Sequence, residues 1–286
     1  MLGLRVDGYH ELDTLFQTIS LHDTIQLTPT DEAEVVLSCD DRRLATDEQN
    51  LVGRAAKALQ DRFATRQGAR IHLQKRIPLQ AGLGGGSSDA AITLLALAHL
   101  WRLAADREAL LEIAGELGAD VPFFFCGGTA RGTGTGKTVA AMGDAAGRYL
   151  LIIKPNANIS TAEAYKVLDE RCLTTRNPKT ILSSSVAEEL FDNAGLVALE
   201  NDFESVAFEL EPEISRAKAA LLNVGAQAAT LTGSGSAVFG VFDSEDAQRR
   251  ATQAIELETG WRVFPCKMVG RDDYRDAFGD LRQLLT

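Results

Sequence analysis

Four glycines crowd one short stretch of the chain, and their spacing suits the binding of a phosphate group. The stretch 78–91 reads PLQAGLGGGSSDAA. Residues 69–77 before it alternate as a strand does, with Ile71, Leu73 and Lys75 on one face, and an apolar run typical of a helix follows it. Glycine backbone N–H groups can close on a ligand, and a helix N-terminus carries unpaired N–H groups and partial positive charge. This order of strand, glycine loop and helix therefore predicts a phosphate site.

Two serines after the glycines add hydroxyl groups to this site. The helix is expected to begin at about Ser87, so the hydroxyls of Ser87 and Ser88 would be donors to a phosphate, and either could face a Mg²⁺ ion. The alternative is a tight strand-to-helix turn with serine caps. Two familiar nucleotide patterns do not fit, because Ser87 replaces the last glycine of GxGxxG, and SSD follows where a Walker A loop requires GK[ST].

Asp120 is a second candidate for chemistry. It lies in the sequence LGADVP, which three phenylalanines follow. Gly118 ends a predicted helix, and Pro122 restricts the backbone before it. A carboxylate held against an apolar wall on a restrained backbone suits a catalytic base. An aspartate that caps the next turn is the alternative, and the local sequence leaves both open.

Another glycine-rich stretch, GGTARGTGTGK at residues 127–137, imitates a Walker A loop. It has Arg131 where the first glycine of that motif belongs, and no helix pattern follows it. We therefore interpret residues 129–142 as a β-hairpin with a glycine-rich tip.

Composition and charge limit the class of protein. The chain has 286 residues, 45% of them hydrophobic, and a formal net charge of −11. This charge argues against non-specific binding to nucleic acid or to anionic membrane surfaces. The four cysteines are far apart and form no metal-binding pattern, which indicates reduced thiols in a cytoplasmic protein and no structural zinc. No apolar run is long enough to span a bilayer.

The remaining pattern predicts alternating strands and helices in two domains. Residues 172–185 are polar and predict a flexible loop, and Pro155 suggests a boundary between a domain of residues 1–153 and one of residues 154–286. Strands are expected on both sides of residues 22–23 and at 35–38, 149–154 and 261–267; helices are expected at 50–63, 107–117, from 160, from 201, at 214–224 and at 244–258.

These stretches resemble the motifs of the GHMP kinases, whose central motif is Pro-x-x-x-Gly-Leu-Gly-Ser-Ser-Ala-Ala. The variant GLGGGSSDAA, with DGYHEL at residues 7–12 and GADVPF at residues 118–123, is similar to the family of 4-diphosphocytidyl-2-C-methyl-D-erythritol kinases. The resemblance covers essentially the whole chain. It implies an α+β, two-domain kinase that uses ATP and Mg²⁺ to phosphorylate the 2-hydroxyl of a small cytidine diphosphate substrate, in the non-mevalonate isoprenoid pathway. It leaves the oligomeric state open.

The resemblance also implies which residues form the kinase site. Asp120 would be the catalytic aspartate, facing the substrate hydroxyl. Residues 229–242, whose alternative is a plain hairpin, would be the C-terminal glycine motif, with Gly233 and Ser234 at the substrate. Ser87 would be the candidate ligand of Mg²⁺. The loop that wraps the ATP phosphates would comprise Pro78, Leu79, Gln80, Ala81, Gly82, Leu83, Gly84, Gly85, Gly86, Ser87 and Ser88.

Four aromatic or imidazole side chains would hold the cytosine ring by the same resemblance. Tyr9 would stack on the base, His10 would hydrogen-bond its edge, and Phe16 would line the pocket. Tyr165 would supply a second aromatic face. Composition alone favours simpler roles for Tyr9 and His10, namely a tyrosine at a strand entry and a solvated histidine. For Tyr165, a helix-face tyrosine on the core remains an open alternative.

The chain departs from that family at its beginning. The family opens with a strand bearing Ala-Lys-Ile/Leu-Asn, whereas this chain begins at Met1 inside the turn that follows that strand, and its first lysine is Lys57. We expect the natural protein to start further upstream, because every later motif is intact. The alternatives are a non-catalytic nucleotide-binding protein, as a degenerate kinase without its lysine, and another small-molecule kinase of the same superfamily.

Overall fold

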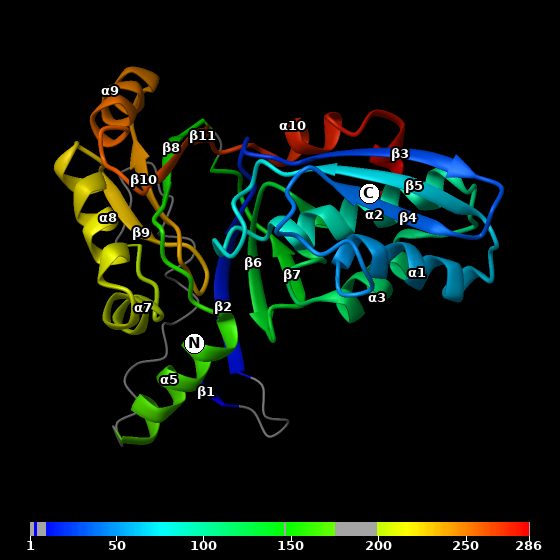
Figure 1. Ribbon diagram of the computed structural model, residues 1–286, viewed down its shortest axis with the longest axis horizontal. Coiled ribbons are helices and arrows are strands. Elements are labelled where there is room, and N and C mark those ends of the chain that lie inside the picture. Colours follow the sequence, from blue (N-terminus) through cyan, green and yellow to red (C-terminus); the bar gives the residue numbers. More distant parts are fainter. Residues whose placement is uncertain (1–2, 5–9, 146, 175–198, 286) are drawn as a thin grey trace.

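The computed structural model describes residues 3–4, 10–145, 147–174 and 199–285. Figure 1 shows β3, β4 and β5 with helices α1–α3 on one side, and β8–β11 with helices α7–α9 on the other. The sheet that contains β2 and β6 lies between them. This mixture of helices and sheets confirms the expected α+β class. None of the helices in the described ranges is long and apolar enough to cross a membrane.

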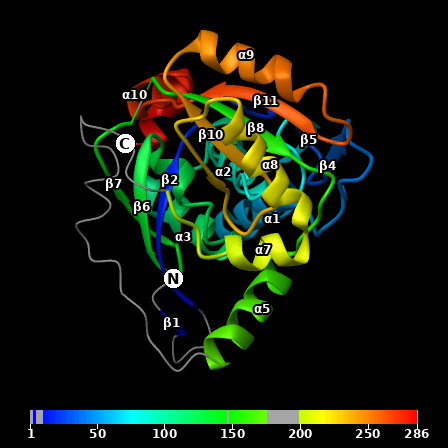
Figure 2. The same ribbon diagram turned by 90° about the vertical axis from the view of Figure 1, so that its left-hand side faces the viewer.

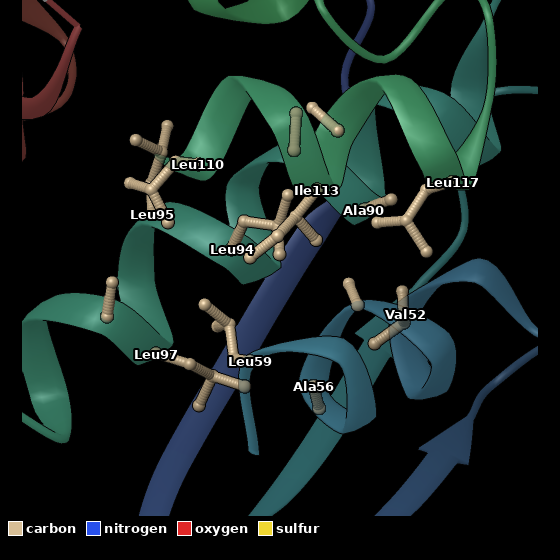
Figure 3. Close-up of a cluster of buried hydrophobic side chains, with 14 of the residues drawn as sticks. Val52, Ala56, Leu59, Ala90, Leu94, Leu95, Leu97, Leu110, Ile113 and Leu117 are labelled. Atoms are coloured by element: carbon tan, nitrogen blue, oxygen red, sulfur yellow. The ribbon is translucent and has the colours of Figure 1, made fainter. Parts of the chain in front are cut away.

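The first hydrophobic core forms where three helices pack beside a three-stranded sheet. Helix α2 is apolar on nearly every side and is accordingly the most buried of the three. Figure 3 shows Leu59 of α1, Leu94 of α2 and Ile113 of α3 pointing toward one another. The bounds are β3 Thr24–Thr30, β4 Val35–Cys39, α1 Leu51–Phe63, β5 Gly68–Gln74, α2 Gly85–Leu100 and α3 Arg107–Leu117.

Side-chain caps fix where two of these helices begin. The Asn50 side chain accepts a hydrogen bond from the Val52 N–H at 3.0 Å, and the Asp106 side chain accepts one from the Ala109 N–H at 2.8 Å. Each bond satisfies a backbone donor that the first helical turn leaves unpaired. Both starts agree with the sequence-based expectation.

The register of the first sheet brings two charged residues together. Its strand order is β3-β5-β4, with β3 antiparallel and β4 parallel to β5. Thr24 pairs with Gln74 at one end of the ladder, so the next residues outward, Asp23 and Lys75, are neighbours. Lys75 therefore begins the segment that leads from β5 into the glycine loop.

The middle sheet has the order β1-β2-β6-β7, and all its described pairs are antiparallel. Its last two strands form the hairpin expected for residues 129–142. The short helix α4 follows Asp120 and leads into this hairpin. The bounds are β1 Gly3–Leu4, β2 His10–Gln17, α4 Phe123–Cys126, β6 Thr129–Gly134 and β7 Thr138–Ala141.

The third sheet has the antiparallel order β11-β8-β10-β9 and carries the second core. Figure 2 shows α8 lying over β10. Strand β8 pairs with β10 and β11, which favours placing residues 149–154 in the C-terminal domain. The expected domain boundary between residues 153 and 154 stays a prediction. The bounds are β8 Tyr149–Lys154, α5 Thr161–Thr174, α7 Glu204–Leu210, α8 Pro212–Asn223, β9 Ala228–Leu231, β10 Val238–Phe242, α9 Glu245–Ile255 and β11 Arg262–Lys267.

After β11 the chain returns to the first core. Helix α10 (Arg271–Asp276) and a 3₁₀ helix (Gly279–Leu284) follow, and Leu285 is fully buried among the residues of that core. The Tyr274 hydroxyl donates to the Phe124 carbonyl at 2.8 Å, so α10 also holds the segment after Asp120.

One expected loop begins later than the sequence pattern indicated. Helix α5 continues through Thr174, so the first residues of the expected flexible loop at 172–185 are helical. Residues 172–174 are Cys, Leu and Thr, and they include no glycine or proline that would end the helix. The rest of that expected loop, from residue 175, lies outside the described residues.

Candidate active site

The glycine loop has the backbone shape of an anion-binding site. Gln80, Gly82 and Gly84 all have positive φ, of 51°, 72° and 65°. Such left-handed positions turn neighbouring N–H groups toward one side, which makes a concave nest for an anion. Helix α2 begins directly after Gly84, at Gly85, two residues before the expected start. Its first N–H groups therefore belong to the loop itself.

The serines after the glycines do not cap this helix. The N-cap residue is Gly84, and no side chain caps the helix. The Ser88 hydroxyl donates to the Gly85 carbonyl at 2.8 Å, inside the helix. The half-buried Ser87 makes no side-chain hydrogen bond with any described residue. Its hydroxyl is therefore available to a ligand, and the capping alternative for the serines is wrong.

A second loop closes against the first from the other half of the chain. Gly82 packs so closely on the turn between β9 and β10 that a Cβ there would overlap the Thr232 carbonyl oxygen. The Thr232 hydroxyl donates to the Gly82 carbonyl, and the Ala237 N–H donates to the Ala81 carbonyl at 3.3 Å. Residues 229–242 form a hairpin, as expected, because β9 and β10 pair antiparallel. The turn of this hairpin brings Gly233 against Gly82.

Asp120 lies in the turn between α3 and α4. Its side chain makes no hydrogen bond or ion pair with any residue of the described ranges, and α4 has no side-chain cap. The capping alternative for Asp120 therefore finds no support in these contacts. Although the residue as a whole is exposed, protein atoms crowd the carboxyl, and this desolvation raises its pKa.

Two contacts link Asp120 to the other parts of the site. Phe124, four residues after Asp120, has its Cζ 3.1 Å from the place where a Cβ of Gly84 would be. Burial raises the pKa of Tyr165, and the charge of Asp120 raises it further, which places Asp120 within electrostatic range of that phenol. The Asp120 segment thus contacts the glycine loop through Phe124, and Asp120 itself is near Tyr165 of helix α5.

His10 and Tyr165 lie face to face. Their ring centroids are 4.6 Å apart with an interplanar angle of 26°, and Tyr165 meets Phe203 edge to face at 4.9 Å. The His10 Nε2 is 2.6 Å from the Asp169 Oδ1. The structure therefore brings His10 together with Tyr165, as their expected shared pocket requires, and adds Asp169 as the partner of the imidazole.

Of the other two residues of the expected cytosine pocket, Phe16 alone is among the described residues. Phe16 stacks on Phe123 at 4.9 Å and packs over Gly132, on the β2–β6 face. Tyr9 lies outside the described residues. Ser234, from the second glycine loop, has its hydroxyl 2.9 Å from the Thr161 hydroxyl at the start of α5.

A buried ion cluster beside the glycine loop was missed by sequence reasoning. The Lys75 Nζ is 2.8 Å from the Asp89 Oδ2 and also donates to the Asp23 Oδ2. Burial opposes the Lys75 charge, but the two carboxylates outweigh it and raise its pKa. Burial raises the pKa of Asp89 to about 7, with Lys75 opposing and Asp23 adding to this effect. The alternation of residues 69–77 was the sequence feature that could have indicated this cluster, because it places Lys75 on the same face as Ile71 and Leu73.

Between pH 4 and pH 8, the free energy of unfolding of Asp89→Asn is expected to rise relative to that of the parent. The folded-state pKa of about 7 exceeds the ordinary aspartate pKa of 3.8, so the folded chain holds the Asp89 proton more tightly than the unfolded chain does. Parental stability therefore falls as the pH rises from 4 to 7, and asparagine avoids this loss. Urea unfolding at pH 4 and pH 8 measures the difference. The surface control Asp61→Asn should change little, and a stability difference between Asp89→Asn and the parent that is the same at pH 4 and pH 8 would contradict the expectation.

No cluster of three or more His, Cys, Asp or Glu side chains suited to a metal ion occurs among the described residues. Oxygen atoms at the site come instead from hydroxyls, such as that of Ser87, and from isolated carboxylates, such as that of Asp120. Mg²⁺ commonly takes only one or two protein ligands and completes its shell with phosphate oxygens and water.

Comparisons with known proteins agree with this arrangement. Residues 50–128 match the GHMP kinases N terminal domain, and residues 183–259 match the GHMP kinases C terminal family. A 4-diphosphocytidyl-2-C-methyl-D-erythritol kinase of Solibacter usitatus (strain Ellin6076) is 38% identical, over 96% of this chain and 86% of that protein. A 4-diphosphocytidyl-2-C-methyl-D-erythritol kinase of Bacillus subtilis (strain 168) is 35% identical, over 95% of this chain and 93% of that protein.

Solved structures are similar over the same extent. A crystal structure of 4-(cytidine 5'-diphospho)-2C-methyl-D-erythritol kinase superposes with a TM-score of 0.78 at 32% identity, over 94% of each chain. A homoserine kinase of Cytophaga hutchinsonii gives a TM-score of 0.70 at 24% identity, over 90% of this chain and 89% of that one, which supports the fold alone.

Proposed function

Because the chain belongs to the GHMP kinases, and within them to the 4-diphosphocytidyl-2-C-methyl-D-erythritol kinase family, we propose that it phosphorylates 4-diphosphocytidyl-2-C-methyl-D-erythritol with ATP. The substrate 2-hydroxyl oxygen attacks the γ-phosphorus. A new P–O bond forms as the bond to the bridging β–γ oxygen breaks, ADP leaves, and the hydroxyl proton passes to the Asp120 carboxylate. The observation that carries this proposal is the meeting of both glycine loops, with Phe124 of the Asp120 segment packed on the first loop.

The positions of the site residues support the roles that we propose for them. Residues 78–88 would surround the ATP phosphates with backbone N–H groups, and the N-terminus of α2 would favour the negative charge. Phosphoryl transfer needs alignment and charge neutralisation more than covalent help from the protein. Asp120 would orient and deprotonate the acceptor hydroxyl, and its raised pKa makes it a stronger base.

Mg²⁺ fits this arrangement through Ser87. The Ser87 hydroxyl is a hard oxygen without a partner among the described residues, and it lies in the first turn after the glycines. Bound Mg²⁺ would neutralise phosphate charge. The protein's own part is to present that hydroxyl and to leave the remaining positions to phosphate oxygens and water.

The direct test is ATP-dependent phosphorylation of the cytidine substrate by the purified chain. Mass spectrometry should find the product with a new 2-phosphate, and homoserine and mevalonate should remain unchanged. ATP binding without transfer to any of these substrates would instead favour the degenerate, non-catalytic reading. Transfer to another small alcohol but not to the cytidine compound would favour a different GHMP kinase.

We further propose that His10 and Tyr165 hold the cytosine, with Asp169 orienting the imidazole. Tyr165→Ala should weaken the cytidine substrate by ~1–3 kcal/mol, the range for stacking of a base on an aromatic ring, and should leave ATP affinity unchanged. Tyr165→Phe keeps the ring and serves as the matched control, with affinity near that of the parent. Isothermal titration with each ligand measures both, and parental substrate affinity in Tyr165→Ala would remove this residue from the pocket.

A further inference from the structure

Three charged side chains meet in the protein interior directly beside the glycine loop. Lys75 lies between Asp23 and Asp89, with side chains only 4%, 2% and 5% exposed. The lysine comes from the end of β5, one aspartate from the start of β3, and the other from the second turn of α2. An ion group this deeply buried is maintained only if each charge keeps its partners, because an unpaired buried charge is strongly unfavourable.

The cluster is hydrogen-bonded to the segment that leads into the glycine loop. The Asp23 Oδ1 accepts the backbone N–H of Arg76 at 2.6 Å and that of Ile77 at 2.9 Å. These are the two residues immediately before Pro78, where the loop begins. Asp23 therefore fixes the backbone of this entry and, with its other oxygen, holds Lys75.

The same cluster also contacts helix α2, which follows the glycine loop. Asp89 binds Lys75 from within α2. A Cβ placed on Gly85, the first residue of that helix, would lie 3.4 Å from the Lys75 Nζ and 2.9 Å from the Ile77 Cγ2. The entry at Ile77 and the exit at Gly85 thus touch each other and share one ammonium group, so the separation of the two ends of the loop depends on this contact.

We propose that Lys75, Asp23 and Asp89 hold residues 78–84 in their phosphate-binding shape, which makes Lys75 a positioning residue for the nucleotide. The inference rests on the proposed function only in identifying the loop's ligand as ATP. Lys75 itself is buried under the loop and touches no ligand. Its effect is on preorganisation, since a loop already held in the bound shape loses less entropy on binding.

Lys75→Met is the first test, with Lys57→Met as the matched control for an exposed lysine paired with Asp61. Hydrogen exchange of residues 76–90 in the ligand-free chain should become at least tenfold faster in Lys75→Met, while exchange of α9 stays parental. Affinity for a Mg²⁺ complex of a non-hydrolysable ATP analogue should fall at least tenfold. Affinity for the cytidine substrate should stay within about threefold of the parent. Lys57→Met should change none of these.

A second variant separates positioning from stability. Lys75→Met leaves two carboxylates without their cation, whereas in Lys75→Met/Asp89→Leu only Asp23 remains charged, and its carboxylate still accepts the N–H groups of Arg76 and Ile77. We expect this double variant to melt above Lys75→Met and still show fast loop exchange and weak nucleotide binding. Asp89→Asn, which retains an oxygen acceptor for Lys75, should keep parental loop exchange and nucleotide affinity.

Parental loop exchange in both Lys75 variants would overturn the inference, as would parental nucleotide affinity in a stable double variant. The exchange measurement needs neither ATP nor the cytidine substrate. A parent that fails to phosphorylate the cytidine substrate would therefore count against the proposed function, while the exchange rates of residues 76–90 would still decide the role of the cluster.

Discussion

Asp120→Asn is expected to lower the turnover number by about 10²–10⁴-fold, the usual contribution of a general base, with ATP affinity nearly unchanged. Asparagine keeps the shape of the side chain but removes the charge and the proton acceptor. The Asp120 carboxyl has no partner among the described residues, so its loss breaks no structural bond there. Steady-state kinetics with the cytidine substrate, together with titration of ATP, measures the two quantities. A variant that turns over at the parental rate would show that Asp120 is not the base.

The same variant should also gain stability, which a capping aspartate would not do. Desolvation raises the pKa of Asp120, so its ionisation costs folded-state stability at pH values above the ordinary aspartate pKa of 3.8. Asparagine removes that cost, and the melting temperature at pH 8 should rise. Asp106 is the matched control, because it caps α3. Asp106→Ala should lose about 0.5–2 kcal/mol of stability and keep its activity.

Gly84→Val should remove most nucleotide binding. Gly84 has a φ of 65°, and a Cβ there would lie 3.1 Å from the Phe124 Cζ. A β-branched residue in the left-handed region carries strain of ~1–3 kcal/mol, and relief of that strain would turn the N–H groups out of the phosphate-binding shape. Because 1.4 kcal/mol corresponds to a tenfold change, affinity should fall by up to roughly 100-fold from strain alone. The methyl groups would also block the close approach of a phosphate. Titration with ATP measures the loss.

Gly115→Ala is the control for this change. Gly115 lies within α3, where a Cβ meets nothing within 4 Å. Alanine should add about 0.5–1 kcal/mol of stability there and leave ATP affinity alone. If Gly84→Val binds ATP as the parent does and remains folded, residues 78–88 are not the nucleotide loop.

Local signals allowed several elements to be predicted closely. Helix α3 has the expected bounds, because Asp106 and Gly118 mark both of its ends in the sequence. The start of α2 was placed two residues late, because a serine is the usual cap and nothing local shows that Gly84 takes the left-handed conformation instead. Signals within a few residues thus determine most element types, and unusual backbone angles shift their ends.

Contacts between distant positions escaped the sequence analysis for a different reason. Asp23 reaches Lys75 only because β3 and β5 pair in one register, and Asp169 reaches His10 only because α5 lies beside β2. No spacing rule connects such residues when they lie on separate elements. The glycine loop and Asp120 could be found because their neighbours in the chain are themselves informative.

The return of the chain after β11 bears on how the protein folds during synthesis. Leu285 fills part of the core formed by α1, α2 and α3, and its carbonyl accepts a hydrogen bond from Arg107 at 3.2 Å. Tyr274 secures the segment that follows Asp120. The first core therefore stays incomplete on the ribosome until the whole third sheet has been translated and residues 271–285 have emerged. The order of translation and the order of assembly differ, and a nascent chain stopped after β7 would expose apolar surface for chaperones to recognise.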